Sequence, residues 1–215
     1  MSRGHLIVFE GIDGSGTTTQ VAEMRKRFLG LGLPVHTTAQ PSAGPIGVLI
    51  RQVLTGRLVL RGSKPLSWAT MSLLFAADRQ DHQEAEIGPN LRDGVNVVCD
   101  RYVPSSVIYQ SVTADWDEAP EWILELNRHI RQPDLLFYLK VDSGEASRRR
   151  EKRAEDAEIF DDPQLQAQLV EHYDQLGELI PGLPVVTLDG SQTVDEIAAE
   201  AWRHVEKLRA KGAPV

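Results

Sequence analysis

Near the beginning of the chain, three closely spaced glycines precede three consecutive threonines. They lie in the stretch Phe9-Glu10-Gly11-Ile12-Asp13-Gly14-Ser15-Gly16-Thr17-Thr18-Thr19. Glycines at such a turn let backbone N–H groups approach an anion, and a helix beginning at the threonines adds the positive end of its dipole. A hydroxyl at the position of Thr18 is the group that reaches Mg²⁺ in such loops. The stretch predicts a phosphate-binding loop formed by Gly11, Gly14, Ser15, Gly16, Thr17, Thr18 and Thr19.

One position of this loop departs from the usual pattern. A lysine that reaches the outer phosphates normally follows the last glycine, and here Thr17 stands in its place. The glycines and the hydroxyl remain. Taken alone, the loop leaves two interpretations open, a phosphate site without its lysine or a tight turn that binds nothing.

A second pair of chemically useful residues is Asp100-Arg101, which directly follows the apolar run Val95 to Cys99. A carboxylate at the end of a strand can hold Mg²⁺, directly or through water, beside a phosphate loop. An arginine there can form a forked contact with a phosphate. The alternative is an ordinary ion pair at a strand end.

Two further groups of residues could contact a nucleotide. Phe75 and Arg79 are four residues apart on a predicted helix, so they share a face that could stack on a base and bond to its edge. Spacing alone favours the alternative, a core phenylalanine and a solvated arginine. Arg149 and Arg153 lie one helical turn apart within the basic run from Arg148 to Arg153 and could close over phosphates. A solvated charged face is the alternative for this run.

The pattern of apolar residues predicts five strands that alternate with helices. The expected strands are Leu6 to Phe9, Val35 to Thr38, Val95 to Cys99, Asp134 to Val141 and Pro184 to Leu188. After the helix that begins at Thr17 to Thr19, the expected helices are Ile46 to Leu54, Pro65 to Asp93 with a break near Gly88-Pro89, a helix starting at Ser105 to Gln110, Glu121 to Arg131, Ser143 to Arg153, Gln164 to Ile180 and Thr193 to Leu208. This order predicts an α/β fold with a five-stranded parallel sheet, helices on both faces and ligands at the carboxyl ends of the strands.

The composition limits the number of domains, the binding partners and the location that can be expected. The 215 residues suit one domain, and an apolar fraction of 41% is enough for a core. A net charge of −8 argues against non-specific nucleic-acid binding. The single cysteine, Cys99, is expected to be a buried thiol, and no apolar run reaches membrane-spanning length. Nothing near Met1 has the pattern of a signal peptide, so we expect a cytoplasmic protein with no membrane partner.

Taken together, these stretches resemble the thymidylate kinase family. The matching segments, in the family's order, are the glycine loop with Thr18-Thr19-Gln20, Leu74-Phe75-Ala76-Ala77-Asp78-Arg79, Asp100-Arg101-Tyr102-Val103 with Ser105-Ser106 and Tyr109-Gln110, Pro133-Asp134-Leu135, and Asp189-Gly190-Ser191-Gln192. The resemblance implies a nucleoside-monophosphate-kinase-like fold in a single domain, 1–215, with a small helical lid at about 143–161. It also implies ATP and Mg²⁺, the phosphorylation of dTMP to dTDP, and a homodimer.

The same resemblance assigns roles to individual residues. Thymine would stack on Phe75 and bond to Arg79, with Ser106 near the base edge and Tyr109 under the deoxyribose. Ser105 and Gln110 complete the implied dTMP site. Arg101 would bridge the phosphates, Asp13 would orient the sugar and phosphate end of dTMP, and Thr18 and Asp100 would serve Mg²⁺. The turn ending at Gln192 would lie along the adenine, and the catalytic set is Asp13, Arg101, Arg149 and Arg153.

Three departures from the family pattern lie near the phosphates. Thr17 replaces the lysine, Ala39-Gln40-Pro41-Ser42 replaces Arg-Glu-Pro-Gly, and Glu155 to Phe160 replaces the usual lid segment containing Asp-Arg-x-Glu. Because some family members carry an arginine where Ser15 stands, the lid is the better source of the missing charge, and we expect Arg149 or Arg153 to supply part of it. Two alternatives remain open, a nucleotide-binding protein that has lost catalysis and a kinase for another deoxynucleotide.

Overall fold

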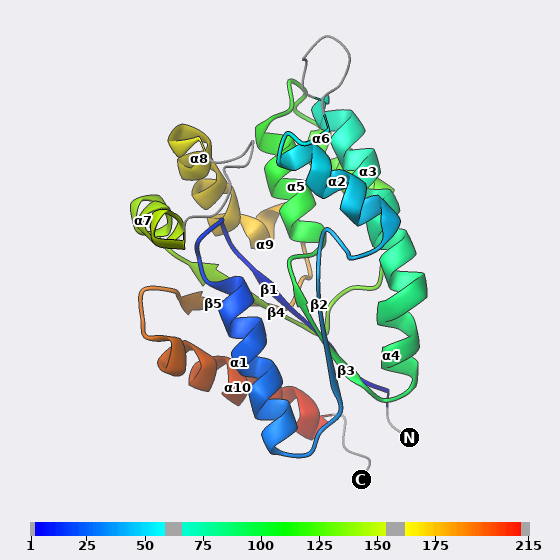
Figure 1. Ribbon diagram of the computed structural model, residues 1–215, viewed down its shortest axis with the longest axis vertical. Helices are drawn as coiled ribbons and strands as arrows, with labels where there is room; N and C mark the ends of the chain where they lie inside the picture. Colours follow the sequence, from blue (N-terminus) through cyan, green and yellow to red (C-terminus); the bar gives the residue numbers. More distant parts are fainter. Residues whose placement is uncertain (1–2, 59–65, 154–161, 212–215) are drawn as a thin grey trace.

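The fold is described from a computed structural model over residues 3–58, 66–153 and 162–211 (Figure 1). Its centre is a five-stranded sheet in the order β2-β3-β1-β4-β5, with every neighbouring pair parallel. The strands are β1 Leu6–Glu10, β2 Val35–Ala39, β3 Asn96–Asp100, β4 Leu135–Lys140 and β5 Val185–Asp189. All five predicted strands are confirmed within one residue at each end. Unbroken apolar runs are what strands covered on both faces require.

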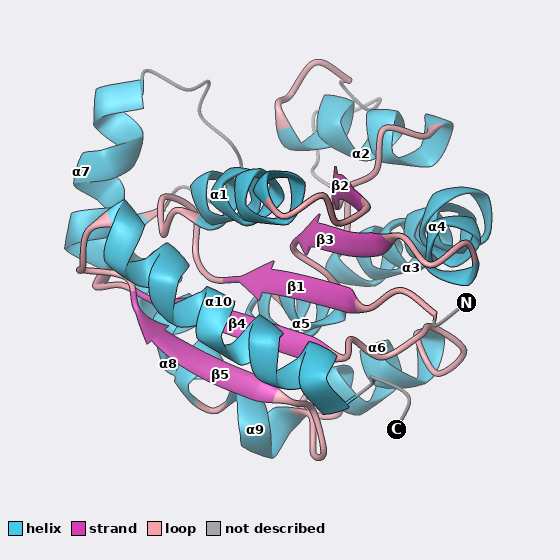
Figure 2. Ribbon diagram, turned by 90° about the horizontal axis from the view of Figure 1, so that it is seen from below, coloured by secondary structure: helices cyan, strands magenta, loops and turns pink. Residues whose placement is uncertain are grey.

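The helices form a layer on each face of the sheet (Figure 2). They are α1 Thr17–Gly30, α2 Pro45–Leu54, α3 Trp68–His82, α4 Gly88–Arg92, α5 Val103–Val112, α6 Ala119–Leu126, α7 Ser143–Arg153, α8 Pro163–Asp174, α9 Leu176–Leu179 and α10 Val194–Lys211. Alternate residues of β1 pack against the helices on opposite faces of the sheet. Ile7 and Phe9 join the core beneath α1 and α10, whereas Leu6 and Val8 join the core on the opposite face.

The predicted long helix from Pro65 to Asp93 needs two corrections. Pro65 lies outside the described residues, and the helix begins at Trp68, where the Ser67 hydroxyl accepts a hydrogen bond from Thr70 N at 3.2 Å. The irregularity comes before Gly88-Pro89, as a π-helical segment, Gln83–Ile87, that leads into α4. The wider turn tolerates Pro89, which has no N–H to donate.

Other helix ends also differ from the sequence pattern. Helix α6 stops at Leu126, where the Asn127 amide donates to Ile123 O at 2.7 Å, so the predicted extension to Arg131 is wrong. The predicted helix Gln164 to Ile180 is divided into α8 and α9. A capping box begins α10, since Thr193 N donates to Glu196 and Glu196 N donates to the Thr193 hydroxyl.

The parallel order places the carboxyl ends of the strands, and the loops that follow them, at the end of the molecule that holds α7 and α2 (Figure 1). Cys99 is fully buried, as expected. Among the described helices, none has both the length and the apolar character needed to cross a bilayer.

Candidate active site

The glycine loop between β1 and α1 has the backbone that an anion site needs. Gly14 and Gly16 adopt φ angles of 85° and 101°, a left-handed region that favours glycine. A side chain at Gly14 would also collide with the backbone of α7, because its Cβ would lie 2.4 Å from Ala146 O. The loop ends at Thr17, the first residue of α1, so the N-terminus of this helix faces the loop.

Thr18 and Asp100 meet beside this loop. The Thr18 hydroxyl donates to Asp100 Oδ2 at 2.5 Å, which joins the first turn of α1 to the end of β3. Within the described part of the chain, Asp100 Oδ1 is buried and has no hydrogen-bond partner. An unpartnered carboxylate oxygen next to a hydroxyl and a phosphate loop suits Mg²⁺ held directly or through water.

Arg101 is held in an unusual conformation at the centre of the site. Its φ of 67° lies in the left-handed region although it is not glycine. The guanidinium donates to Asp13 Oδ1 at 2.5 Å and to the Ser105 and Tyr109 hydroxyls at 3.2 Å each. Burial opposes the charged form of Arg101, but the neighbouring Tyr109 and Asp13 outweigh it and raise its pKa. The guanidinium of Arg101 is therefore held in one orientation and stays charged.

Glu10 supports this arrangement from beneath, and the sequence reasoning did not select it. Its fully buried carboxylate accepts hydrogen bonds from Tyr102 N at 2.7 Å, from the Ser105 hydroxyl at 2.7 Å and from the Tyr173 hydroxyl at 2.8 Å. Burial raises the pKa of Glu10, although these hydrogen bonds oppose the shift. Glu10 thereby joins β1, the first turn of α5 and α8 directly behind Arg101.

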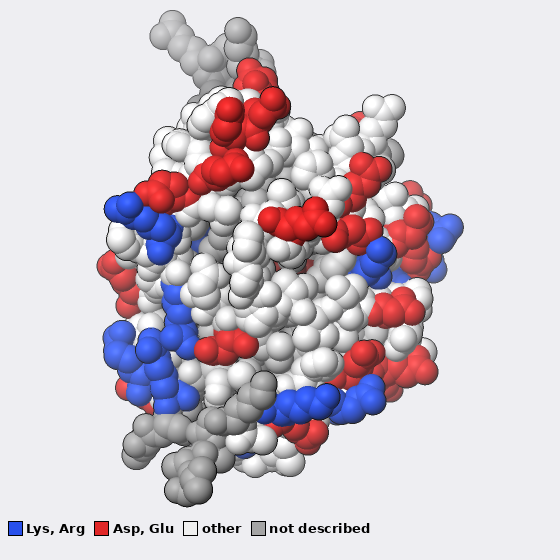
Figure 3. Space-filling view, turned by 180° about the vertical axis from the view of Figure 1, so that it is seen from behind, with Lys and Arg blue, Asp and Glu red and all other residues white. Residues whose placement is uncertain are grey.

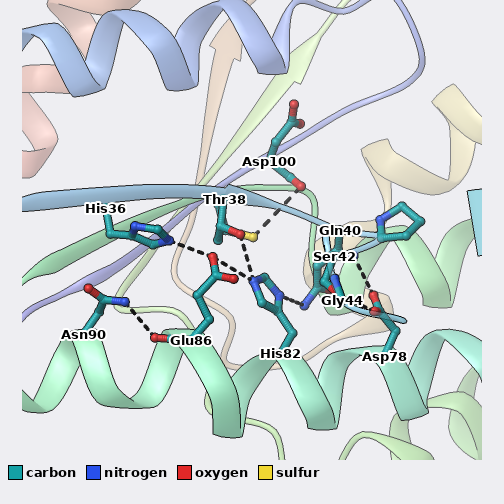
Figure 4. Close-up of polar contacts among 12 residues, drawn as sticks. His36, Thr38, Gln40, Ser42, Gly44, Asp78, His82, Glu86, Asn90 and Asp100 are labelled. Atoms are coloured by element: carbon teal, nitrogen blue, oxygen red, sulfur yellow. Dashed lines mark hydrogen bonds and ion pairs between the residues drawn. The ribbon is translucent and has the colours of Figure 1, made fainter. Parts of the chain in front are cut away.

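Arg79 is not the solvated residue that helical spacing alone favours. Its side chain is 1% exposed, and it donates to Gln40 Oε1, Asn127 Oδ1, Tyr102 O and the Ser106 hydroxyl at 2.6–3.2 Å. His82, three residues further along α3, is also buried. Its ring contacts groups of β2 and of the loop that follows it, and these side chains are shown in Figure 4.

A cavity of about 220 Å³ opens between α2, α3 and α5. The predicted base-site residues Phe75, Arg79, Ser105, Ser106, Tyr109 and Gln110 all line it, together with Asp13 and Arg101. Gln40 and Arg51 line it as well, and the sequence reasoning missed both as site residues. Arg51 donates to Ser42 O at 2.5 Å and also to Pro41 O, and its charge lies in the wall of this cavity.

Two more cavities continue along the loop. One, of about 220 Å³, is lined by residues that include Thr17, Thr18, Asp100, Arg101 and Arg51. The other, of about 270 Å³, lies on the far side of the loop and is lined by residues that include Ser15, Thr19, Gly190 and Gln192. Asp13 and Arg101 border both of the first two cavities, so these two adjoin.

The basic helix α7 reaches the loop through Arg149, one of the two predicted arginines, and through its neighbour Arg150. Arg149 donates to Gly190 O at 3.0 Å and to Ser15 O at 3.5 Å. Arg150, which the sequence reasoning did not select, donates to Asp13 O at 2.6 Å. The side chain of Arg153 and the lid segment Glu155 to Phe160 lie outside the described residues. Arg149 and Arg150 thus place two positive charges against the loop that lacks its lysine.

Comparison with known proteins agrees with this geometry. The sequence profile described as thymidylate kinase matches residues 9–201. A "probable thymidylate kinase" from Pyrococcus horikoshii is 37% identical over 186 residues, which cover 86% of this chain and 88% of the relative. Another from Pyrobaculum calidifontis is 37% identical over 206 residues, covering 95% and 97%.

A solved structure with the same fold is that of thymidylate kinase from Candida albicans. It superposes with a TM-score of 0.80 at 25% sequence identity and covers 97% of this chain and 94% of that one. The profile spans most of this chain, and the relatives align over nearly all of their own length. This chain belongs to the thymidylate kinase family.

Proposed function

We propose that this chain catalyses the reaction of its family, the transfer of the γ-phosphoryl group of ATP to dTMP to give dTDP. The observation that carries this proposal is the pair of adjoining cavities that share Asp13 and Arg101. One cavity is lined by an aromatic ring and a buried arginine, and the other by the phosphate loop with Thr18 and Asp100. An acceptor nucleotide and a donor phosphate held in these cavities would meet at Arg101.

The thymine base would lie in the first cavity. Phe75 offers a ring for stacking, and Arg79 and Ser106 offer donors for a carbonyl of the base. Gln110 Oε1 is buried and, among the described residues, has no hydrogen-bond partner. An unpartnered acceptor there suits the N3–H of a pyrimidine.

The sugar and phosphate end of dTMP would lie toward Tyr109, Asp13 and Arg101. The Tyr109 hydroxyl donates to Asp13 Oδ2 at 3.0 Å, and burial raises the pKa of Tyr109, so this donor keeps its proton. The ring of Tyr109, which lines this cavity, would lie under the deoxyribose and disfavour a 2′-hydroxyl. Ser105 Oγ, held by Glu10, accepts from the Arg101 guanidinium and keeps it in place.

The donor phosphates of ATP would lie on the glycine loop, with adenine in the third cavity near Gln192. Thr18 and Asp100 would hold Mg²⁺, which would neutralise charge on the phosphates during transfer. Phosphoryl transfer depends on positive charge around the migrating group. Arg101, Arg149 and Arg150 would supply this charge, to which the lysine contributes in loops that have one. Arg153 remains a candidate for the same role.

The partners that we propose are ATP and dTMP, without nucleic acid or membrane, in a cytoplasmic enzyme. On one face of the molecule, Lys and Arg side chains are interspersed with Asp and Glu rather than gathered in one basic surface (Figure 3). Val48 and Leu49 of α2 and Leu73 of α3 are exposed apolar side chains on two neighbouring helices. They favour a homodimer, and a molar mass near 23.9 kDa in light scattering would contradict it.

Replacing Phe75 with leucine is expected to raise the KM for dTMP about tenfold and to leave kcat within about twofold. Stacking of a base on an aromatic ring typically contributes about 1–3 kcal/mol, and leucine keeps the apolar surface without the ring face. Steady-state kinetics with varied dTMP measure the effect, and the KM for ATP serves as the internal control. An unchanged KM for dTMP would mean that the base lies elsewhere.

A further inference from the structure

Arg79 is a buried cation whose direct partners are all neutral. Its guanidinium donates to an amide oxygen of Gln40 at 2.8 Å, to another of Asn127 at 2.6 Å, and to Tyr102 O and the Ser106 hydroxyl. Within the described residues, no carboxylate forms an ion pair with it. Burial lowers the pKa of Arg79. A buried charge normally needs a countercharge, and the carboxylates of Glu10 and Asp78 supply part of it from nearby without forming an ion pair.

The contacts of Gln40 lead from Arg79 to the next turn of α3, where His82 lies. Gln40 Nε2 lies 3.2 Å from His82 Nδ1, and His82 Nε2 lies 2.8 Å from the Thr38 hydroxyl (Figure 4). His82 Nε2 also lies 3.4 Å from Glu86 Oε1, and that oxygen lies 2.6 Å from His36 Nε2. A continuous line of side chains therefore joins the buried Arg79 to the half-buried carboxylate of Glu86.

The donors and acceptors along this line of side chains can be assigned in only one direction. Because Gln40 Oε1 accepts from Arg79, its NH₂ group must face His82 and donate to Nδ1. His82 then has its proton on Nε2, which faces both the Thr38 oxygen and Glu86 Oε1. Every step donates from the cation toward the anion.

The far end of the line carries the negative charge. Partial burial opposes ionisation of Glu86, but hydrogen bonds from Thr38 and His36 outweigh it and lower its pKa. The contact between His82 Nε2 and Glu86 Oε1 at 3.4 Å brings this charge to the imidazole. Aligned hydrogen bonds polarise one another, so the Glu86 charge is felt at Arg79 through neutral groups.

We propose that Gln40 and His82 are positioning residues for base recognition, which act by fixing the Arg79 guanidinium in the orientation that meets the thymine carbonyl. The proposal rests on the proposed base site. In this chain the neutral amide has only one orientation that satisfies both neighbours, and His82 selects that orientation.

The test compares two variants of His82 that both replace the imidazole with a side-chain amide. The amide oxygen of His82→Asn takes about the place of Nδ1 and can still accept from Gln40. In His82→Gln the amide takes about the place of Nε2, and the acceptor facing Gln40 is lost. We expect His82→Gln to raise the KM for dTMP about tenfold, the effect of one buried hydrogen bond left unmade, with kcat within about twofold. His82→Asn should keep the KM within about threefold of the wild type.

A purely structural role for His82 predicts equal kinetics for the two variants, with any difference confined to thermal stability. Equal KM values for dTMP in both variants would overturn the proposal. If His82→Gln shows no cooperative thermal transition, Gln40→Met, which fills a similar volume, interrupts the same line and carries the same expectation for KM.

Arg79→Lys separates this proposal from the assignment of the base site. If Arg79→Lys raises the KM for dTMP but neither His82→Gln nor Gln40→Met does, the base site stands and the positioning role is wrong. If Arg79→Lys leaves the KM for dTMP unchanged, the base site itself is wrong. Isothermal titration with dTMP in the absence of ATP checks that the changes in KM reflect binding.

Discussion

Arg101→Met is expected to lower kcat for dTMP phosphorylation about a thousandfold. Arg101 borders both adjoining cavities, and its fork is fixed by Asp13, Ser105 and Tyr109. Removing one fixed positive group from a phosphoryl-transfer site typically costs about 10²–10³ in rate, and a bridging arginine can cost more. Methionine keeps the unbranched stem, so the left-handed backbone at this position is strained no more than in the wild type.

The matched control is Arg101→Lys, which keeps the charge but loses the fork. We expect it to retain far more activity than Arg101→Met, with a loss of about tenfold, because lysine acts as a single point charge. Single-turnover measurements with saturating ATP and dTMP separate the chemical step from binding. Equal loss in both variants, accompanied by an equal fall in melting temperature, would indicate that Arg101 serves the fold rather than the reaction.

The double variant Arg149→Ala/Arg150→Ala is expected to lower kcat by about 10²–10³. Both arginines donate to backbone oxygens of the glycine loop or of the adjoining turn, and this loop has Thr17 where a lysine usually stands. Their charges would therefore stabilise the transferring phosphoryl group. Arg148→Ala is the control on the same helix, since the Arg148 side chain is largely exposed and bonds to Glu145 rather than to the loop. It should leave kcat within about twofold.

Adding Thr17→Lys tests whether the arginines compensate for the missing lysine. Thr17 lines the cavity beside Asp100, so a lysine there would extend toward the phosphates. We expect Thr17→Lys to raise kcat at least tenfold in the double variant and much less in the wild type. An equal factor in both backgrounds would mean that the two sources of charge act independently, which contradicts compensation.

The fold could be predicted from the sequence because each of its central strands is a continuous run of apolar residues. Leu6 to Phe9 or Leu135 to Leu139 can be buried on both faces only in a parallel sheet between helices. Helix ends were harder to predict. The π-helical segment before Gly88 and the stop after Leu126 depend on contacts that apolar periodicity does not encode.

The candidate site could be predicted only where its residues lie close together in the sequence. The glycine loop and Asp100-Arg101 stand at strand ends, and the fold brings them together. The burial of Arg79 could not be predicted from spacing, because its four partners come from three distant segments, the loop after β2, the start of α5 and the end of α6. The same limit explains why Arg150 was missed, since which arginines of α7 face the loop depends on how the helix is placed.

The most direct test of the proposed activity is a coupled ADP-release assay of the wild-type chain with ATP, Mg²⁺ and dTMP, run beside Asp100→Ala. We predict ADP release that requires dTMP and that falls at least a hundredfold in Asp100→Ala. Faster turnover with another deoxynucleotide would assign a different acceptor. If the wild type binds ATP and dTMP but releases no ADP, the chain is a nucleotide-binding protein that lost catalysis with its lysine, and the proposed kinase activity is contradicted.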